Sequence, residues 1–445
     1  MQTKQIQLSD HFTYQKLLRF TLPSIVMMIF TSIYSVVDGF FVSNFVGKAP
    51  FAALNLIFPF LMILGAAGFM IGTGGSALVS MTLGEGDRDR ANRLFTMLVI
   101  VTAVSGAAFA LLGLAVLRPL AAALGAEGEI LEYSVLYGRI LLPVTGAFML
   151  QNVFQSFFVT AEKPKLGLAV TVAAGAANIV LDALFVAGFR WGLAGAAAAT
   201  AISQIVGGLL PVLYFALPNS SLLRLTRTRF DGRALLRTCA NGSSELMSNV
   251  SMSLVSMLYN FQLLRFAGED GVAAYGVIMY VNFIFAAVFL GYSIGCAPVV
   301  GYHYGAGNRE ELRGLLRRSL TLIVGFNLAL TALAELSAPA LGQIFVSYDA
   351  ALLDMTVHGF RLYAISFLFA GVNVFGSAFF TALNNGLVSA GISFARTLIF
   401  QLGAVALLPL VLGLDGVWLA IVLAELLALA VTAACLVRMR GRYHY

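Results

Sequence analysis

The sequence repeats itself at a fixed offset of 221 residues, and this duplication limits the folds that the chain can adopt. Three glycine-containing motifs of the first half return in the second half without a gap. They are Phe45-x-Gly47, Gly84-x-Gly86-Asp87 and Gly192-Leu193-x-Gly195, which return as Phe266-x-Gly268, Gly305-x-Gly307-Asn308 and Gly413-Leu414-x-Gly416. A repeat of this length predicts two equivalent structural halves with a pathway between them.

Composition places the chain in a membrane, because 60% of its residues are hydrophobic, only 11% are charged and the mean hydropathy is +0.90. About 20 apolar residues suffice to cross a bilayer as a helix. Stretches of this kind recur at residues 14–42, 50–78, 92–117, 131–158, 166–188, 193–217, 235–263, 272–302, 315–338, 354–381, 388–412 and 416–437. We predict an all-α integral membrane protein with twelve transmembrane helices in two pseudo-symmetric six-helix bundles.

The predicted domains follow the repeat. Residues 1–217 form an N-terminal six-helix lobe, residues 218–232 a polar and basic cytoplasmic linker, and residues 233–445 a C-terminal six-helix lobe. One chain thus supplies both halves of the pathway, and we expect a monomer.

Lys and Arg residues gather in alternate loops, and this bias predicts the orientation of the chain in the membrane. One side contains Lys4, Lys16, Arg19, Lys163, Lys165 and the basic clusters at 88–93, 224–237, 309–318 and 438–442, whereas the other side contains only Lys48, Arg118, Arg190 and Arg265. Both termini are therefore predicted to be cytoplasmic, in a multi-pass protein of the bacterial inner membrane. The net charge of +6 has the same origin. It predicts contact with anionic membrane lipid and argues against nucleic-acid binding.

Few ionisable residues lie inside the predicted helices, where each is costly. Asp38 and Asp182 are two of them. Tyr34 and Asn178 each precede one of these acids by four residues, so each pair shares a helix face. Thr200 lies on a small-residue stripe of the sixth helix. Two buried acids repel each other unless a cation or a shared proton neutralises them, so the cluster predicts a reversible site for H⁺ or Na⁺.

The second half of the repeat provides an internal comparison, because a residue needed only for packing is expected in both halves. Asp38, Asn178, Asp182 and Thr200 correspond to Tyr259, Ile399, Gly403 and Ile421. The polar cluster therefore belongs to the N-terminal lobe alone. For each residue taken singly, a hydrogen bond to a neighbouring helix stays an alternative interpretation.

Several motifs in order resemble those of the multidrug and toxic compound extrusion (MATE) family, over essentially the whole chain. They are Phe20-x2-Pro23-Ser24, Tyr34-x3-Asp38-Gly39, Asn178-x3-Asp182 and the paired Gly84-x-Gly86-Asp87 and Gly305-Ala306-Gly307-Asn308 loops. The resemblance implies a V-shaped pair of six-helix bundles that opens alternately to either side. It also implies export of cationic or amphipathic compounds in exchange for H⁺ or Na⁺.

The resemblance also assigns residues. Asp38, Asn178, Asp182 and Thr200 match the family's cation site, which makes them the predicted ligands of Na⁺ or H⁺. Tyr34 and Asn152 match polar residues beside that site, and Pro23 matches a first-helix proline that bends the helix. The predicted substrate cavity comprises Tyr34, Asn152, Gln155, Glu245 and Asn260.

The chain departs from the family pattern in the C-terminal lobe. Members with an acidic site there carry a Glu deep in the seventh helix, whereas the stretch Val250–Asn260 contains no acid and Glu245 lies earlier in that helix. A C-terminal ion site is therefore not expected, and the roles of Arg396 and Glu425 stay open.

Two other classes of function are alternatives to an antiporter. A flippase for a lipid-linked saccharide or a peptidoglycan precursor would need cations around its cavity, and Arg139, Arg361 and Arg396 are the candidates. A membrane-embedded enzyme would need a catalytic motif such as His-Glu-x-x-His, and none is apparent in the sequence. We expect no enzyme activity, no cofactor and a small, cationic substrate.

Overall fold

The computed structural model describes residues 6–347 and 349–445, apart from the side chains of Ser35, Phe40, Ser43, Asn44 and Lys48. The first five residues of the predicted N-terminal lobe, and the Lys48 side chain counted above, lie outside this description. All regular secondary structure in the described part of the chain is helical. Its helices account for the apolar stretches that the sequence contains.

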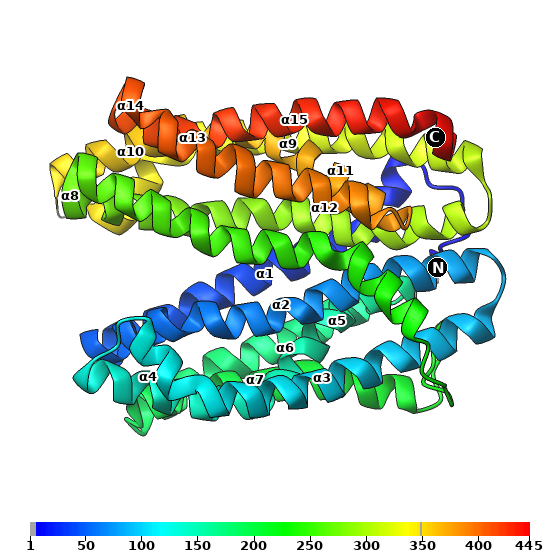
Figure 1. Cartoon of the computed structure of the whole chain (residues 1–445), viewed down its shortest axis with the longest axis horizontal. Helices are drawn as coiled ribbons and strands as arrows, with labels where there is room; N and C mark the ends of the chain where they lie inside the picture. The colour runs from blue at the N-terminus through cyan, green and yellow to red at the C-terminus, as the bar shows by residue number, and fades with distance from the viewer. Residues whose placement is uncertain (1–5, 348) are drawn as a thin grey trace.

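The first half of the repeat contains seven α-helices and two short segments of other helix types (Figure 1). They are α1 (Tyr14–Phe45), α2 (Lys48–Gly84), α3 (Arg88–Ala123), α4 (Gly128–Leu141), the 3₁₀ segment η1 (Leu142–Val144), α5 (Thr145–Thr160), α6 (Pro164–Asp182), the π segment η2 (Ala183–Gly188) and α7 (Gly192–Ala216).

The second half follows the same order. It contains α8 (Gly232–Gly305), α9 (Arg309–Val346), α10 (Ala350–Ala364), α11 (Phe367–Ala382), α12 (Gly386–Phe394), the π segment η3 (Ala395–Gln401), α13 (Leu402–Leu407), α14 (Pro409–Leu412) and α15 (Leu414–Tyr443).

The 74-residue α8 is two membrane helices in sequence. A straight helix of that length would measure about 110 Å, far more than the roughly 30 Å of a bilayer's hydrocarbon core. Gly268, with φ of 62° and ψ of −150°, breaks the helix near its middle. Ten described helices are long and apolar enough to cross a membrane, and α10 with α11, bent by 48°, makes an eleventh. The break at Gly268 adds the twelfth, which confirms the predicted fold class.

The duplication extends to backbone geometry. Gly47 and Gly268, Gly86 and Gly307, and Gly192 and Gly413 all have positive φ, and each pair is related by the offset of 221 residues. In the second pair the next residue caps a helix. Asp87 accepts a hydrogen bond from the Arg90 amide at the start of α3, and Asn308 accepts one from the Glu311 amide at the start of α9.

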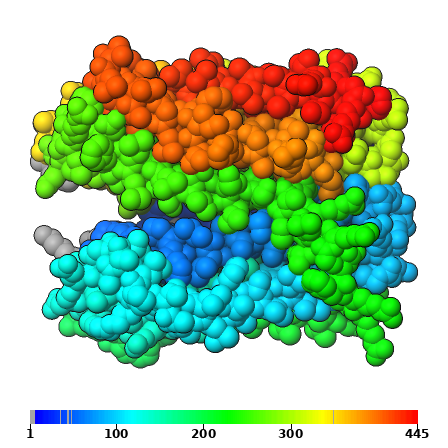
Figure 2. All heavy atoms as spheres, in the orientation of Figure 1, coloured from blue at the N-terminus to red at the C-terminus, as the bar shows by residue number. Residues whose placement is uncertain are grey.

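The two halves of the repeat lie side by side. Figure 1 shows α1–α7 on one side of the molecule and α8–α15 on the other, with both chain ends at the same end. We call this end the basic face, because the starts of α3 and α9 bring their arginines to it. In Figure 2 a cleft between the halves opens at the end opposite the basic face.

Glycines bring the two halves into backbone contact near the basic face. A Cβ on Gly84 would collide with the Tyr302 carbonyl oxygen, and a Cβ on Gly305 would collide with that of Met81. Further along α2, Gly74 faces Gly242 in the same way, in the part of α8 that precedes the break at Gly268. The halves therefore meet closely only because these positions carry no side chain.

The segment before α1 connects the halves at the basic face. The Leu8 amide donates to the Glu162 carboxylate of the first half at 2.6 Å. The Phe12 amide donates to the Glu311 carboxylate of the second half at 2.9 Å, and His11 contacts the same carboxylate. Leu8 and Phe12 are completely buried. This segment thus holds the two halves together at one end.

We predict that Gly84→Val separates the halves at the basic face, because the added side chain must displace the backbone of α8. Spin labels at the exposed positions Asp89 and Glu310, in a variant without Cys239, Cys296 and Cys435, report this distance by pulsed electron paramagnetic resonance. Gly325→Val is the matched control, because a Cβ there meets no atom within 4 Å. An unchanged distance in Gly84→Val would contradict the assigned contact.

Candidate functional site

A polar cavity of about 190 Å³ lies inside the first half of the repeat. Its lining comes from six helices, α1, α2 and α4–α7, and its polar residues include several that the sequence singles out. They are Tyr34 and Asp38 of α1, Gln151, Asn152 and Gln155 of α5, Asn178 of α6, and Thr200, Ser203 and Gln204 of α7, among apolar neighbours that include Phe58 and Met62 of α2. The structure therefore brings together residues that are up to 170 positions apart in the chain.

Hydrogen bonds connect three of the four predicted cation-site residues. The Thr200 hydroxyl donates to the Asp38 carboxylate at 3.4 Å, and the Asn178 amide donates to the Thr200 oxygen at 3.5 Å. Both distances are at the long end of the normal range. The three side chains therefore point toward a common centre without being tightly bonded to each other.

Asp182 completes the cluster and is completely buried. Neither of its carboxylate oxygens receives a hydrogen bond from a described residue, and the same is true of the Asn178 carbonyl oxygen. The carboxyl group of Asp38 lies within interaction distance of Asp182. Two carboxylates are both acceptors, so the pair is satisfied only when a proton or a cation lies between them. Three buried oxygens without donors fit such an occupant, since hard cations prefer oxygen ligands.

Local sequence places these side chains. Asp182 is the last residue of α6, and the π segment η2 begins directly after it. The wider π turn changes the direction in which the following side chains point. Asp182 can therefore face α1 while Val186 of the π segment is buried. A Cβ on Gly195 of α7 would press against Phe185 of η2, so this glycine allows α7 to approach. The sequence contains no direct signal for the π segment.

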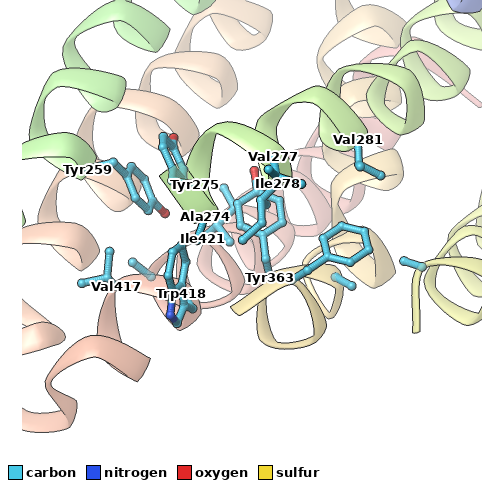
Figure 3. Packing of buried hydrophobic residues seen from close by; sticks show 14 of the residues in the cluster. Tyr259, Ala274, Tyr275, Val277, Ile278, Val281, Tyr363, Val417, Trp418 and Ile421 are labelled. Carbon is cyan, nitrogen blue, oxygen red and sulfur yellow. The ribbon is translucent and has the colours of Figure 1, made fainter. Parts of the chain in front are cut away.

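The second half fills the equivalent place with aromatic and aliphatic side chains (Figure 3). Tyr259, at the position of Asp38, stacks on Tyr275 with ring centroids 4.8 Å apart. Trp418 and Ile421, the latter at the position of Thr200, lie in the same buried cluster. This half therefore has a hydrophobic core where the first half has a polar cavity.

A second cavity of about 140 Å³ lies between the halves. Met28, Phe69 and Ser156 from the first half contribute to its lining, and Leu290 and Thr381 from the second half face them. Phe69 also lines the polar cavity, so the two cavities are neighbours.

Glu245 of α8 is the only ionisable residue among the described lining residues of this second cavity, with Asn249 one turn away. Of the other predicted substrate residues, Tyr34, Asn152 and Gln155 line the polar cavity, and the Asn152 amide also donates to the Gly65 carbonyl. Asn260 is exposed and lines neither cavity. Pro23 lies inside α1, which continues as a helix through it. Their roles in transport stay predictions.

Sequence reasoning did not find one network in the second half. Arg396 of η3 donates to the Glu425 carboxylate of α15 at 2.8 Å, and Asn373 of α11 donates to its other oxygen at 2.7 Å. Thr432 donates to Asn373 in turn. Glu425 is 2% exposed, and its charge is fully compensated. Only proximity in space could reveal this pair, because its members lie 29 residues apart on different helices.

The three arginines that a flippase would need do not converge. Arg396 pairs with Glu425, Arg361 lies 3.9 Å from Glu335 with half of its side chain exposed, and Arg139 is exposed on α4. None of them lines either cavity. The cavities thus lack the cationic lining that would bind a pyrophosphate.

The model of the MatE family matches this chain twice, over residues 23–184 and 246–405. The two matches fall in the two halves of the repeat. The chain belongs to the MatE family. It is therefore a membrane transporter and not an enzyme.

Individual relatives agree with this assignment. This MatE protein is 23% identical over 366 residues to the multidrug export protein MepA of Staphylococcus haemolyticus, covering 81% of this chain and 80% of that protein. It superposes on a crystal structure of a MATE protein in complex with MaL6 with a TM-score of 0.93, 25% identity and 99% of each chain covered. An outward-facing multidrug resistance MATE family transporter gives a TM-score of 0.92 and 25% identity over 99% of this chain and 98% of that one.

We predict that Arg396 and Glu425 support the fold of this MatE protein. Arg396→Met alone leaves a buried carboxylate without its cation and should destabilise the protein by about 3 to 5 kcal/mol. The double variant Arg396→Met/Glu425→Gln should recover most of that loss, because no unpaired charge remains. Thermal unfolding in detergent measures both. If the double variant were stable but inactive in efflux, the pair would instead take part in transport.

Proposed function

We propose that this chain is a secondary antiporter that exports cationic or amphipathic compounds in exchange for H⁺ or Na⁺. Membership of the MatE family and similarity to proteins named multidrug export proteins support the export of small molecules. The one-lobe polar cluster supports the coupling to an ion.

One observation carries the coupling proposal: Asp182 is buried beside Asp38 without a donor for either of its oxygens. A bound H⁺ or Na⁺ removes the repulsion between the two acids and satisfies the free oxygens. The long hydrogen bonds of Thr200 allow the cluster to open and close around such an ion. Reversible occupancy of this site is what coupling to an ion gradient requires.

The cavity between the halves supports a cationic substrate. Its one ionisable lining residue is Glu245, which attracts a cation, and Met28 and Phe69 offer an adaptable apolar surface. Because Phe69 lines both cavities, a substrate here lies next to the ion site. An ion bound at Asp38 and Asp182 then weakens substrate binding through positive charge and altered packing, which is the antiport relation.

The closed and open ends of the molecule support alternating access. The halves are in contact at the basic face and apart at the other end (Figure 2). The positive-inside bias supports a cytoplasmic basic face, so the cleft faces outward in the state described here. We propose that the predicted lobes, residues 1–217 and 233–445, rock about the glycine contacts in a monomer in the bacterial inner membrane.

Efflux of ethidium from proteoliposomes tests this function. The wild type is expected to export the dye when either an H⁺ or a Na⁺ gradient is imposed, and the active gradient identifies the ion. Asp38→Asn removes a charge from the ion site and should lower gradient-driven efflux by about tenfold or more. Asp38→Asn and Asp182→Asn variants that both retain full efflux would refute the coupling proposal.

Glu335→Gln is a suitable control, because Glu335 is also an acid within a membrane helix but lies outside both cavities. It should leave efflux near the wild-type value. Loss of efflux in this control would indicate that any change of charge in a helix disrupts the protein, and the Asp38 result would then carry no weight.

Ion binding can be measured without transport. The coupling ion should stabilise the wild type against thermal unfolding, by about 2.7 kcal/mol at a hundredfold excess over the dissociation constant. If Na⁺ is the ion, added NaCl raises the melting temperature more than KCl does; if H⁺ is the ion, the two salts act alike. Asp182→Asn should abolish the Na⁺-specific gain, and a gain that survived it would place the ion elsewhere.

A further inference from the structure

The segment that joins the two halves forms a second, separate feature at the basic face. Residues 218–231 run along the start of α3 and are held there by hydrogen bonds, three of which lie in the central part of this segment. The Arg224 amide donates to Asn92 at 2.8 Å, the Thr226 amide to Thr96 at 2.9 Å, and the Thr228 hydroxyl to the Arg93 carbonyl at 2.7 Å. This linker is therefore a fixed part of the surface.

The linker and α3 enclose a surface pocket of about 1200 Å³ that contains five arginines. They are Arg90 and Arg93 of α3, Arg227 and Arg229 of the linker, and Arg233 of α8. Asp231 is the only acid in the lining, and its carboxylate is occupied in capping α8 through the Arg233 and Ala234 amides. The pocket thus has a strong positive charge with no free acid to balance it.

None of these five guanidinium groups makes an ion pair or a hydrogen bond with another described residue. Neighbouring arginines behave differently: Arg88 donates to the Leu222 and Ser221 carbonyls, and Arg224 donates to that of Asn219. The arginines outside the pocket hold the linker in place, whereas the five inside it keep their donors free for a ligand.

The repeat indicates that this set is more than the general basic character of the face. At the offset of 221 residues, Arg90 and Arg93 correspond to Glu311 and Gly314. In the second half, Glu311 binds the segment before α1 and pairs with Arg318 at 3.1 Å. A membrane orientation signal requires only basic residues on this face, whereas α3, the linker and the start of α8 gather five unpaired arginines into one pocket.

The pocket also has an apolar part. Phe230 lines it and is 72% exposed, and Leu236, one helical turn after Arg233 on α8, is 71% exposed. Large exposed apolar side chains beside free arginines are typical of the boundary between lipid headgroups and acyl chains. A phosphate group fits the guanidinium donors, and an acyl chain fits the apolar part. A soluble phosphate compound would use the arginines but leave the apolar part without a function.

We propose that this pocket binds the phosphodiester headgroup of an anionic phospholipid, and that the bound lipid anchors the inter-lobe linker to the membrane surface. The site is separate from the ion cluster and from both cavities. This inference does not depend on the identity of the transported compound or of the coupling ion.

Native mass spectrometry of the detergent-purified full chain tests the site, with phosphatidylglycerol titrated as the ligand. The wild type should retain phosphatidylglycerol in preference to phosphatidylcholine. Arg227→Gln/Arg229→Gln should weaken binding by about 30-fold, since each arginine near an anionic surface contributes about fivefold. Arg309→Gln/Arg313→Gln removes the same charge from exposed, unpaired arginines elsewhere on the basic face and should leave the affinity unchanged.

Two results would overturn the proposal. Equal weakening in both double variants would mean that the lipid responds to the net charge of the face and not to this pocket. Displacement of phosphatidylglycerol by equimolar glycerol 3-phosphate would show that the pocket accepts a soluble phosphate and makes no use of the acyl chain. Retention of lipid against glycerol 3-phosphate, together with the selective loss in Arg227→Gln/Arg229→Gln, supports a lipid site.

Discussion

The close contact of α2 with α8 is the constraint on which the rest of the structure depends. Gly84, Gly305, Gly74 and Gly242 allow backbone to touch backbone, so the halves are in contact near the basic face. Two straight bundles that touch at one end and diverge at the other leave a cleft at the far end (Figure 2). The two cavities lie on either side of Phe69 within this arrangement, one inside the first half and one between the halves. A tighter or looser glycine contact would change access to both.

The two halves share a scaffold but differ in chemistry. Paired glycines with positive φ and the Asp87 and Asn308 caps fix the same helix boundaries in both. Within that frame, Asp38 is replaced by Tyr259, and a polar cavity by a core of rings. Hydrophobic burial stabilises the second half at the position where the first half places two acids side by side, of which Asp182 has no hydrogen-bond donor among the described residues. The second half thus has an apolar core at this position, whereas the first half has two acids that repel each other unless a proton or a cation neutralises them.

Much of the fold was predictable from sequence, because the lengths of the apolar stretches and the internal repeat are visible along the chain without knowledge of contacts in space. The twelve helices and the grouping of Asp38, Asn178 and Thr200 follow from hydropathy, helix periodicity and the comparison of the two halves. What the sequence could not predict depends on contacts in space. The π segment after Asp182 and the Arg396–Glu425 pair arise from packing between helices that are distant in sequence. The five-arginine pocket likewise forms only because the linker lies on α3. Taken singly, each of these arginines is explained by the orientation of the chain in the membrane.

The helix α1 links the proposed ion site to the contact between the halves. Its Asp38 belongs to the ion cluster, while Thr21 and Ile25, near its other end, lie against Gly295 and Gly291 of α8. A Cβ at either glycine would collide with α1, so this crossing tolerates little change in the path of the helix. The two sites are about four helical turns apart on one continuous helix. A change in charge at Asp38 that moves or bends α1 therefore alters the place where α1 crosses α8. Pro23 lies between Thr21 and Ile25 at this crossing, and it is the one residue of α1 without a backbone N–H donor. If the proposed ion site is correct, α1 is the single element through which ion occupancy and the separation of the halves are coupled.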